Sequence, residues 1–176
     1  TIMQGSQDIA VHVGTLHLTA RAIIDRFQDD IHEGDVFIFN DPYVGGTHFC
    51  DVRVVRPIFY GGEIVSFALT NGHWADVGGT VPGSFDISAK DHFGEGLRIP
   101  PIRIWEKGRY LSDVADCLVA NMRGSEDRLG DLRAQAEATR VGEREFLRLI
   151  EKYGKETVLL AAKECQDYVE RIARQR

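Results

Sequence analysis

Two short segments of the chain each place a histidine three residues before an aspartate, beside a Gly-Gly-Thr. The first unit is His48 and Asp51, preceded by residues 45–47, and the second is His73 and Asp76, followed by residues 78–80. Imidazole nitrogens and carboxylate oxygens bind Zn²⁺, Mn²⁺ and Fe²⁺ in catalytic centres that keep open coordination positions. A metal held in this way polarises a carbonyl group or lowers the pKa of bound water. The two units predict a divalent-metal site if the fold brings them together.

The alternative for each unit is a turn or a strand cap, which a single His-x-x-Asp motif forms more often than a metal site. The segment between the units favours the metal site, because it predicts a β-hairpin. Residues 53–59 and 64–69 are rich in β-branched and aromatic side chains, and Gly61 and Gly62 suit a two-residue turn. Such a hairpin folds the second unit back onto the first.

Counting outward from this turn predicts which residues lie opposite each other. It pairs Cys50 with His73, and it also pairs Val52 with Asn71 and Thr47 with Asp76. Successive side chains of a strand point to opposite faces, so His48 and Asp51 share a side only if a bend lies between them. The glycines at residues 45–46 favour such a bend.

The other elements are expected from apolar periodicity and from turn residues. Apolar side chains at helical spacing predict a helix over residues 12–31 with Thr15 as its N-cap. Short strands are expected at residues 36–39 and 99–105, and a helix at residues 112–122. The last third predicts two long helices, residues 125–153 and 155–175, joined at Gly154 as a helical hairpin. This pair is either a packing layer for the domain or an interface for other subunits.

Together these elements predict an α+β fold, with a β-hairpin-containing mixed sheet and a C-terminal pair of long α-helices. We expect an α/β metal-site region at residues 1–110 and a helical region at residues 111–176 that packs on it. At this length the two regions form most simply one domain.

Composition narrows the class of protein. The 176 residues carry a formal net charge of -6, with 43% hydrophobic and 27% charged residues, as in ordinary globular chains. No basic stripe indicates nucleic-acid binding, and no apolar run is long enough to cross a membrane. The cysteines form no Cys-x-x-Cys, which favours a reducing cytoplasm over a disulfide framework. They are Cys50, Cys117 and Cys165. Beside the proposed ligands, Cys50 is a soft ligand, a reactive thiol or, as is commoner for free cysteine, a small buried side chain.

Several long runs, in order between residues 11 and 154, resemble the hydantoinase B/oxoprolinase family. The longest are GDVFIFNDPYVGGTH at residues 34–48 and GHWADVGG at residues 72–79; others lie at residues 82–84, 95–101, 129–135 and 140–142. Members of that family are several hundred residues long, so the resemblance implies that this chain is a fragment of a larger subunit.

The resemblance also implies a function. B-type subunits of the family act with an ATP-hydrolysing A-type partner, as a hetero-oligomer that opens cyclic amides such as hydantoins or 5-oxoproline. Related complexes carboxylate ketones, and the acetone carboxylase relative holds manganese through His, Asp and His at the spacing of His48, Asp51 and His73. Asp76 is then a candidate to accept a hydrogen bond from a ligand histidine or to act as an acid or base, because ligand histidines usually donate to a carboxylate. His12, in a Val-His-Val-Gly context similar to the family's, is a further acid/base candidate.

Three functions stay open at this point. The first is ATP-dependent cyclic-amide hydrolysis at a Mn, Zn or Fe site, with ATP bound by the A-type ATPase partner. The glycine-rich segments lack the spacing of a P-loop, which is why nucleotide binding is assigned to the partner. The second is ketone carboxylation at the same site, and the third is a non-catalytic assembly fragment. Arg98 binds a carboxylate or carboxyphosphate, or it fastens its loop to an acidic neighbour.

Overall fold

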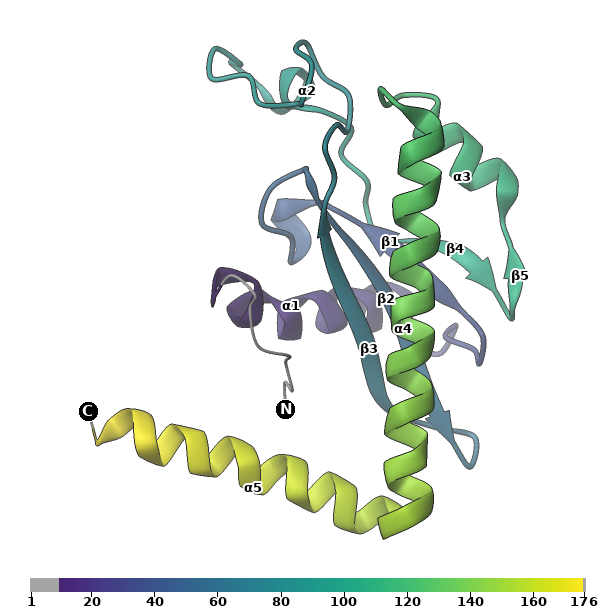
Figure 1. Cartoon of the computed structure of the whole chain (residues 1–176), viewed down its shortest axis with the longest axis vertical. Helices are drawn as coiled ribbons and strands as arrows, with labels where there is room; N and C mark the ends of the chain where they lie inside the picture. Colours follow the sequence, from purple (N-terminus) through teal and green to yellow (C-terminus); the bar gives the residue numbers. More distant parts are fainter. Residues whose placement is uncertain (1–9, 176) are drawn as a thin grey trace.

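The computed structural model describes residues 10–175 and is shown in Figure 1. The strands are β1 (Val36–Phe39), β2 (Asp51–Tyr60), β3 (Glu63–His73), β4 (Ile102–Glu106) and β5 (Arg109–Tyr110). The helices are α1 (Ala10–Phe27), η1 (Pro42–Val44), α2 (His92–Glu95), α3 (Ser112–Val119), α4 (Ser125–Tyr153) and α5 (Lys155–Arg174).

The five strands form one sheet in the order β3-β2-β1-β4-β5. Every neighbouring pair is antiparallel, so the sheet is antiparallel throughout where a mixed sheet was expected. The α+β class, the β-hairpin and the two long C-terminal helices are confirmed.

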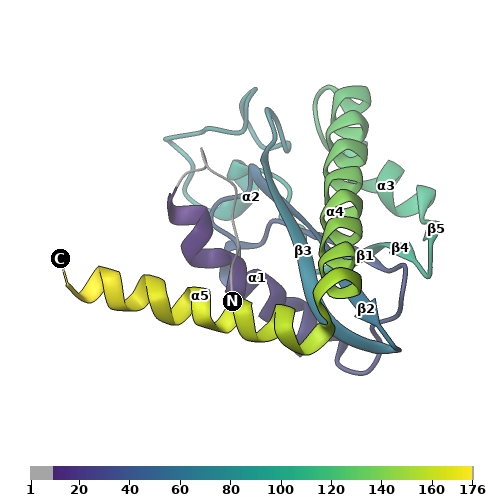
Figure 2. The same cartoon turned by 60° about the horizontal axis from the view of Figure 1, so that its bottom comes forward.

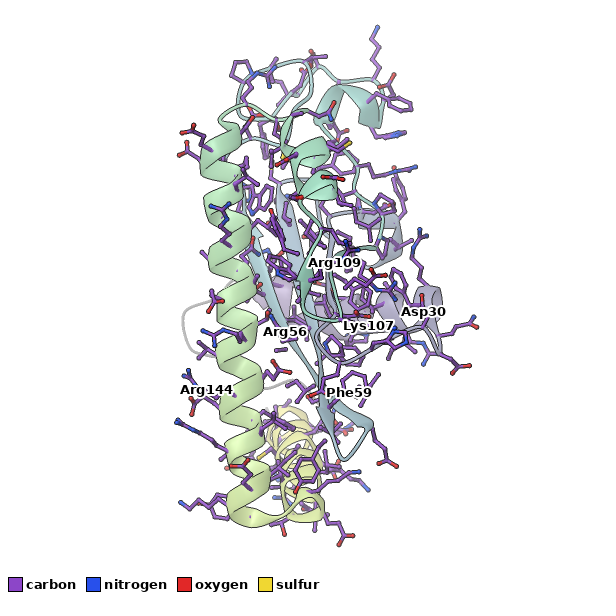
Figure 3. The ribbon with its side chains drawn as sticks, turned by 90° about the vertical axis from the view of Figure 1, so that its right-hand side faces the viewer. Asp30, Arg56, Phe59, Lys107, Arg109 and Arg144 are labelled. Atoms are coloured by element: carbon purple, nitrogen blue, oxygen red, sulfur yellow. The ribbon has the colours of Figure 1, made fainter. Side chains whose placement is uncertain are left out.

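The sheet lies between α1 on one face and α4 on the other (Figure 1). The apolar run of β1 is buried on both faces, as a short continuous apolar strand in a covered sheet should be. Val36 and Ile38 join the larger core cluster with Leu132 of α4, whereas Phe37 joins a smaller cluster with Ile23 of α1. Figure 3 shows Arg56 between the sheet and α4, where its Nε donates to Thr139 Oγ1 at 3.3 Å.

The β2–β3 hairpin keeps the predicted turn but not the predicted register. Gly61 and Gly62 have φ angles of 62° and 82°, the positive values that the tight turn requires. Next to the turn, Phe59 pairs with Ile64 as counted from the sequence. The register then shifts between Ile58 and Phe59, because Val65 is an extra residue on β3.

Beyond this bulge every pair moves by one residue. His73 lies opposite Asp51, not Cys50, and Asn71 lies opposite Arg53, not Val52. The predicted pairs are therefore wrong. Since side chains alternate along a strand, a shift of one residue exchanges the faces of one strand relative to the other. The bulge thus places His73 and Asp51 on the same face.

Some predicted boundaries also change. Helix α1 ends at Phe27, because Gln28 takes a positive φ of 48°, and Thr15 lies inside the helix instead of capping it. Its hydroxyl donates to His12 O at 3.1 Å. Strand β4 begins only at Ile102, since the prolines at residues 100–101 have no N–H to give to a ladder. Helix α3 ends at Val119, three residues before the predicted end.

The two long helices meet at Gly154 as predicted, but they do not form a hairpin. Figures 1 and 2 show α5 running away from the end of α4. The buried side chains of α4 include Leu132, Ala136 and Ile150. The first two belong to the larger core cluster, together with Val36 and Ile38 of the sheet. On α5 only Val158 is buried. Apolar spacing identified the helices, but the angle between them depends on which face of α4 the sheet already covers.

Within residues 10–175, no helix has both the length and the apolar character needed to cross a membrane.

Candidate metal centre

The ends of β2 and β3 place two of the predicted ligands face to face. Asp51 is the first residue of β2 and His73 the last residue of β3, and the two are a register pair. Asp51 Oδ1 lies 3.2 Å from His73 Nδ1. The Asp51 side chain is only 1% exposed, whereas His73 is 56% exposed. The carboxylate therefore forms the floor of the site and the imidazole faces outward.

A turn before β2 brings the third predicted ligand to the same carboxylate. The Asp51 backbone N–H donates to His48 O at 3.0 Å, which closes the bend that the sequence required. His48 Nε2 then lies 3.4 Å from Asp51 Oδ2. The loop can approach α1 only with glycine at residue 45, because a Cβ there would lie 2.8 Å from Leu18 O.

His48, Asp51 and His73 together are suited to hold a divalent ion. One donor atom from each residue lies within 4.8 Å of the other two. The histidine rings meet edge-on with centroids 5.0 Å apart. Burial alone would raise the pKa of Asp51, but hydrogen bonds from Thr47 and His73 and the nearby histidines outweigh it and lower this pKa. Two imidazoles and a carboxylate match the donor set of catalytic Zn²⁺, Mn²⁺ and Fe²⁺ sites.

The structure also brings His12 to this carboxylate. His12 belongs to the first turn of α1. Its side chain is buried, and its Nε2 lies 3.1 Å from Asp51 Oδ2. Asp51 is therefore surrounded by imidazoles from a helix, a loop and a strand. His12, which the sequence offered only as an acid/base candidate, reaches this carboxylate from 39 residues earlier in the chain.

Asp76 lies in a different environment from the one predicted. Its carboxylate accepts hydrogen bonds from the backbone N–H groups of Gly78 and Gly83, both at 2.8 Å, and from Arg123. The predicted pairing of Asp76 with Thr47 is wrong, because Thr47 Oγ1 instead donates to Asp51. Asp76 thus fixes the loop that follows β3.

Sequence reasoning missed a buried arginine next to the site. Arg53 is fully buried and donates to three hydroxyls: Thr19 at 3.0 Å, Thr15 at 2.9 Å and Thr47 at 3.3 Å. The network ties α1 and the loop at residue 47 to β2. A cationic residue inside a strand of β-branched residues was the available signal, since buried charges usually have a specific arrangement of partners.

The remaining candidates, Arg98 and Cys50, fit structural roles and not catalytic ones. Arg98 Nε lies 3.6 Å from Asp41 Oδ2, which fastens the two segments to each other. Cys50 is buried, and burial together with Asp51 and Asp76 raises the pKa of its thiol. A thiol of that kind fits the interpretation of a small buried side chain.

Comparisons with known proteins give a consistent result. A sequence model described as Hydantoinase B/oxoprolinase matches residues 1–176. The chain is 40% identical over 173 residues to caprolactamase subunit beta of Pseudomonas jessenii, covering 98% of this chain and 30% of the relative. The crystal structure of that ATP-dependent caprolactamase matches with a TM-score of 0.89 at 38% identity, over 97% of this chain and 29% of that chain.

Two further relatives have names that describe two different reactions. The chain is 32% identical over 186 residues to 5-oxoprolinase 1 of Arabidopsis thaliana, covering 99% of this chain and 15% of the relative. It is 32% identical over 159 residues to the acetophenone carboxylase delta subunit of Aromatoleum aromaticum, covering 89% and 23%. The chain thus spans less than a third of the length of these relatives.

Proposed function

Because the chain belongs to the hydantoinase B/oxoprolinase family, we propose that it carries the metal site of the catalytic subunit of an ATP-dependent cyclic amidohydrolase. Its relatives include a caprolactamase subunit and a 5-oxoprolinase, and both names describe enzymes that act on lactam rings. The single observation that supports the metal site most strongly is the convergence of His48, Asp51 and His73.

In this proposal, His48, Asp51 and His73 hold one Mn, Zn or Fe ion. When bound, such an ion supplies a Lewis acid that polarises the ring carbonyl or activates a water molecule. Asp51 is held in place by Thr47, which donates to it from the loop side. His12 lies 3.1 Å from Asp51 Oδ2 and, in this proposal, positions the carboxylate or holds a proton there. Asp76 acts at a distance by fixing the loop after β3.

The proposal assigns ATP to an A-type ATPase partner, so that the working enzyme is a hetero-oligomer. The Gly-Gly-Thr segments of this chain lack the spacing and the lysine of a P-loop. Two of the relatives are named as subunits, and the matched crystal structure is named as ATP-dependent. These observations support an enzyme in which this chain binds the metal and the partner binds the nucleotide.

Metal analysis of the purified chain tests the site directly. We expect about one Mn, Zn or Fe per chain by plasma mass spectrometry, and loss of that metal in His73→Ala, because two ligands hold a divalent ion far less tightly than three. His17→Ala is the matched control, since His17 is exposed on α1. Absence of metal from the wild-type chain, or equal metal in both variants, would contradict the proposed site and favour a non-catalytic assembly role.

A carboxylase is the second candidate, favoured by the match to the acetophenone carboxylase delta subunit. The same three ligands would serve that reaction at a ketone instead of a cyclic amide. The complex reconstituted with an A-type ATPase subunit separates the two. Substrate-dependent ATP hydrolysis with lactams or hydantoins supports the amidohydrolase, whereas hydrolysis that requires a ketone and bicarbonate supports the carboxylase.

A further inference from the structure

A small pocket opens beside the proposed metal ligands. It has a volume of about 190 Å³ and is lined by residues 48–50, residues 84–87 and Glu95. We call it the loop pocket. His48 belongs both to the ligand group and to the pocket wall. A larger cavity of about 520 Å³ lies between α1, β3 and α4, but none of the three ligands lines it. The loop pocket is therefore the cavity next to the chemistry.

Buried polar contacts fix the outer wall of the loop pocket. Ser84 is buried, and its Oγ accepts from Val77 N at 2.8 Å and donates to Gly78 O at 2.7 Å. Asp76 holds the same loop through the N–H groups of residues 78 and 83. The floor is formed by Phe49 and Cys50, which are both buried. The backbone at residues 76–84 and the buried floor of the pocket are thus held in place.

The size of the loop pocket suits a small ring. A water molecule takes about 30 Å³ in the liquid, so 190 Å³ corresponds to roughly six waters. That leaves room for a single small ring and is well below a drug-sized site of about 300 to 1,000 Å³. Phe49, Phe85 and Ile87 supply apolar surface, and the side chains of Phe85 and Ile87 are 72% and 97% exposed. A ring in the pocket would cover apolar surface that now faces water.

The charge of the loop pocket is one-sided. Asp86 and Glu95 line it, and its lining residues include no lysine or arginine. Asp86 accepts from Thr80 Oγ1 at 2.5 Å and from Ser88 Oγ at 2.6 Å. These hydrogen bonds, from Ser88 first and then Thr80, lower the pKa of Asp86, so it stays ionised at neutral pH. His48, where the proposed divalent ion binds, lies on a different wall of the pocket from these two carboxylates. With its ring at the ion, a ligand whose own carboxylate points toward Asp86 and Glu95 would meet like charge, which specific sites use to reject the wrong partner.

From this size, surface and charge, we propose that the loop pocket receives the ring of an uncharged cyclic amide and discriminates against a ring that carries a carboxylate. The inference rests on the proposed amidohydrolase function and names its substrate class. Lactams and hydantoins without an acidic substituent fit the pocket, whereas 5-oxoproline does not. Asp86 and Glu95 set this preference by repelling a carboxylate substituent. His48, Asp51 and His73 lie at the ring itself.

A matched pair of substrates tests the inference in the reconstituted complex. 2-Pyrrolidinone and 5-oxoproline share one five-membered lactam ring and differ only in the carboxylate. We expect kcat/KM for substrate-dependent ATP hydrolysis to be at least about tenfold higher for 2-pyrrolidinone. Asp86→Asn and Glu95→Gln should each narrow this gap several-fold by raising the value for 5-oxoproline, with 2-pyrrolidinone changed less than about twofold. The amide oxygen of asparagine at position 86 can still accept from Ser88. Its amide nitrogen can donate to Thr80 Oγ1, whose own proton remains available for Gly94 O.

The control is Asp91→Asn, a carboxylate on the same loop that caps α2 and does not line the pocket. This variant should leave the ratio of the kcat/KM values for the two substrates unchanged. The inference is overturned if kcat/KM of the wild-type complex for 5-oxoproline equals or exceeds that for 2-pyrrolidinone. It is also overturned if Asp86→Asn and Glu95→Gln change kcat/KM for both substrates by the same factor.

Calorimetric binding of both rings to the complex separates this inference from the function on which it rests. If no ring supports ATP hydrolysis, the amidohydrolase proposal fails. Tighter binding of 2-pyrrolidinone, with a gap that closes in Asp86→Asn, would still support the pocket assignment. Equal binding of the two rings would overturn it.

Discussion

The candidate site depends on the carboxylate of Asp51. Imidazoles of His12, His48 and His73 lie 3.1 to 3.4 Å from its oxygens, and Thr47 donates to it. Thr47 Oγ1 also accepts a hydrogen bond from Arg53. Because the guanidinium is only a donor, the hydroxyl proton is directed to Asp51. Thr47 therefore fixes the orientation of the carboxylate before any ion binds.

Thr47→Val tests this role, because it removes the hydroxyl and keeps the shape of the side chain. We expect the affinity for Mn²⁺ or Zn²⁺ to fall by about tenfold or more, as for other groups that hold a metal ligand in place. Thr47→Ser should retain most of the affinity, since it keeps the hydroxyl. The measurement is competition with a chromophoric chelator, with folding monitored by circular dichroism.

A buried threonine on the other face of the sheet supplies the control for Thr47. Thr139 also accepts from a partly buried arginine, Arg56, and donates to a backbone carbonyl. Thr139→Val should lower stability and leave metal affinity unchanged. If both valine variants change metal affinity equally, Thr47 has only a structural role.

Asp76 gives a prediction about pH. Burial alone would raise its pKa, but hydrogen bonds from Gly78, Gly83 and Arg123 bring it below the ordinary value of 3.8. A folded-state pKa below the unfolded one stabilises the protein above pH 3.8, and the stabilisation is lost as pH falls through the folded-state pKa. Asp76→Asn should therefore cost about 2 kcal/mol near pH 7 and progressively less in acid.

Urea unfolding of the wild type and Asp76→Asn between about pH 7 and pH 3 measures this difference. Asp29→Asn, at an exposed position on the loop after α1, controls for the loss of one charge. A destabilisation that stays constant down to the lowest pH would show that the charge of Asp76 is not what holds its loop.

Among the elements, the bulge in β3 has the largest consequence for the site. Sequence patterns predicted the hairpin, its turn and the strand β1 at its exact bounds, because turn glycines and apolar runs are local signals. They did not predict the extra residue at Val65, since a bulge depends on how two strands pack between α1 and α4. The ligands were found by residue type and resemblance, whereas the contact of His12 and the Arg53 network depended on long-range packing.

Deleting Val65 tests the bulge. If the turn at Gly61 and Gly62 is retained, the deletion moves His73 opposite Cys50, and the imidazole leaves the face of Asp51. We expect metal binding to be lost. Val65→Ala keeps the extra residue and should bind metal like the wild type. Unchanged metal affinity in a folded deletion variant would mean that the register does not set the site.

At the scale of the whole molecule, the chain divides into a packed sheet layer and a helix that extends from it. The match to the caprolactamase structure covers 97% of this chain, so it includes most of α5. Leu160, Tyr168 and Val169 of that helix are each more than half exposed. Lys155 at its start pairs with Glu63 at 2.6 Å, but both side chains face solvent, and exposed ion pairs add about 0 to 1 kcal/mol.

These contacts predict that α5 contributes little to folding. Ending the chain after Gly154 should lower the free energy of unfolding by at most about 2 to 3 kcal/mol, because the truncation loses one buried valine and one exposed ion pair. Leu132→Ala in α4 should cost as much or more, about 2 to 5 kcal/mol, since Leu132 is 1% exposed in the core. Urea unfolding compares the two variants. A truncation that unfolds the chain would show that the sheet layer depends on α5.

The truncated chain should also self-associate less than the full chain, as measured by light scattering, because exposed apolar side chains are removed with α5.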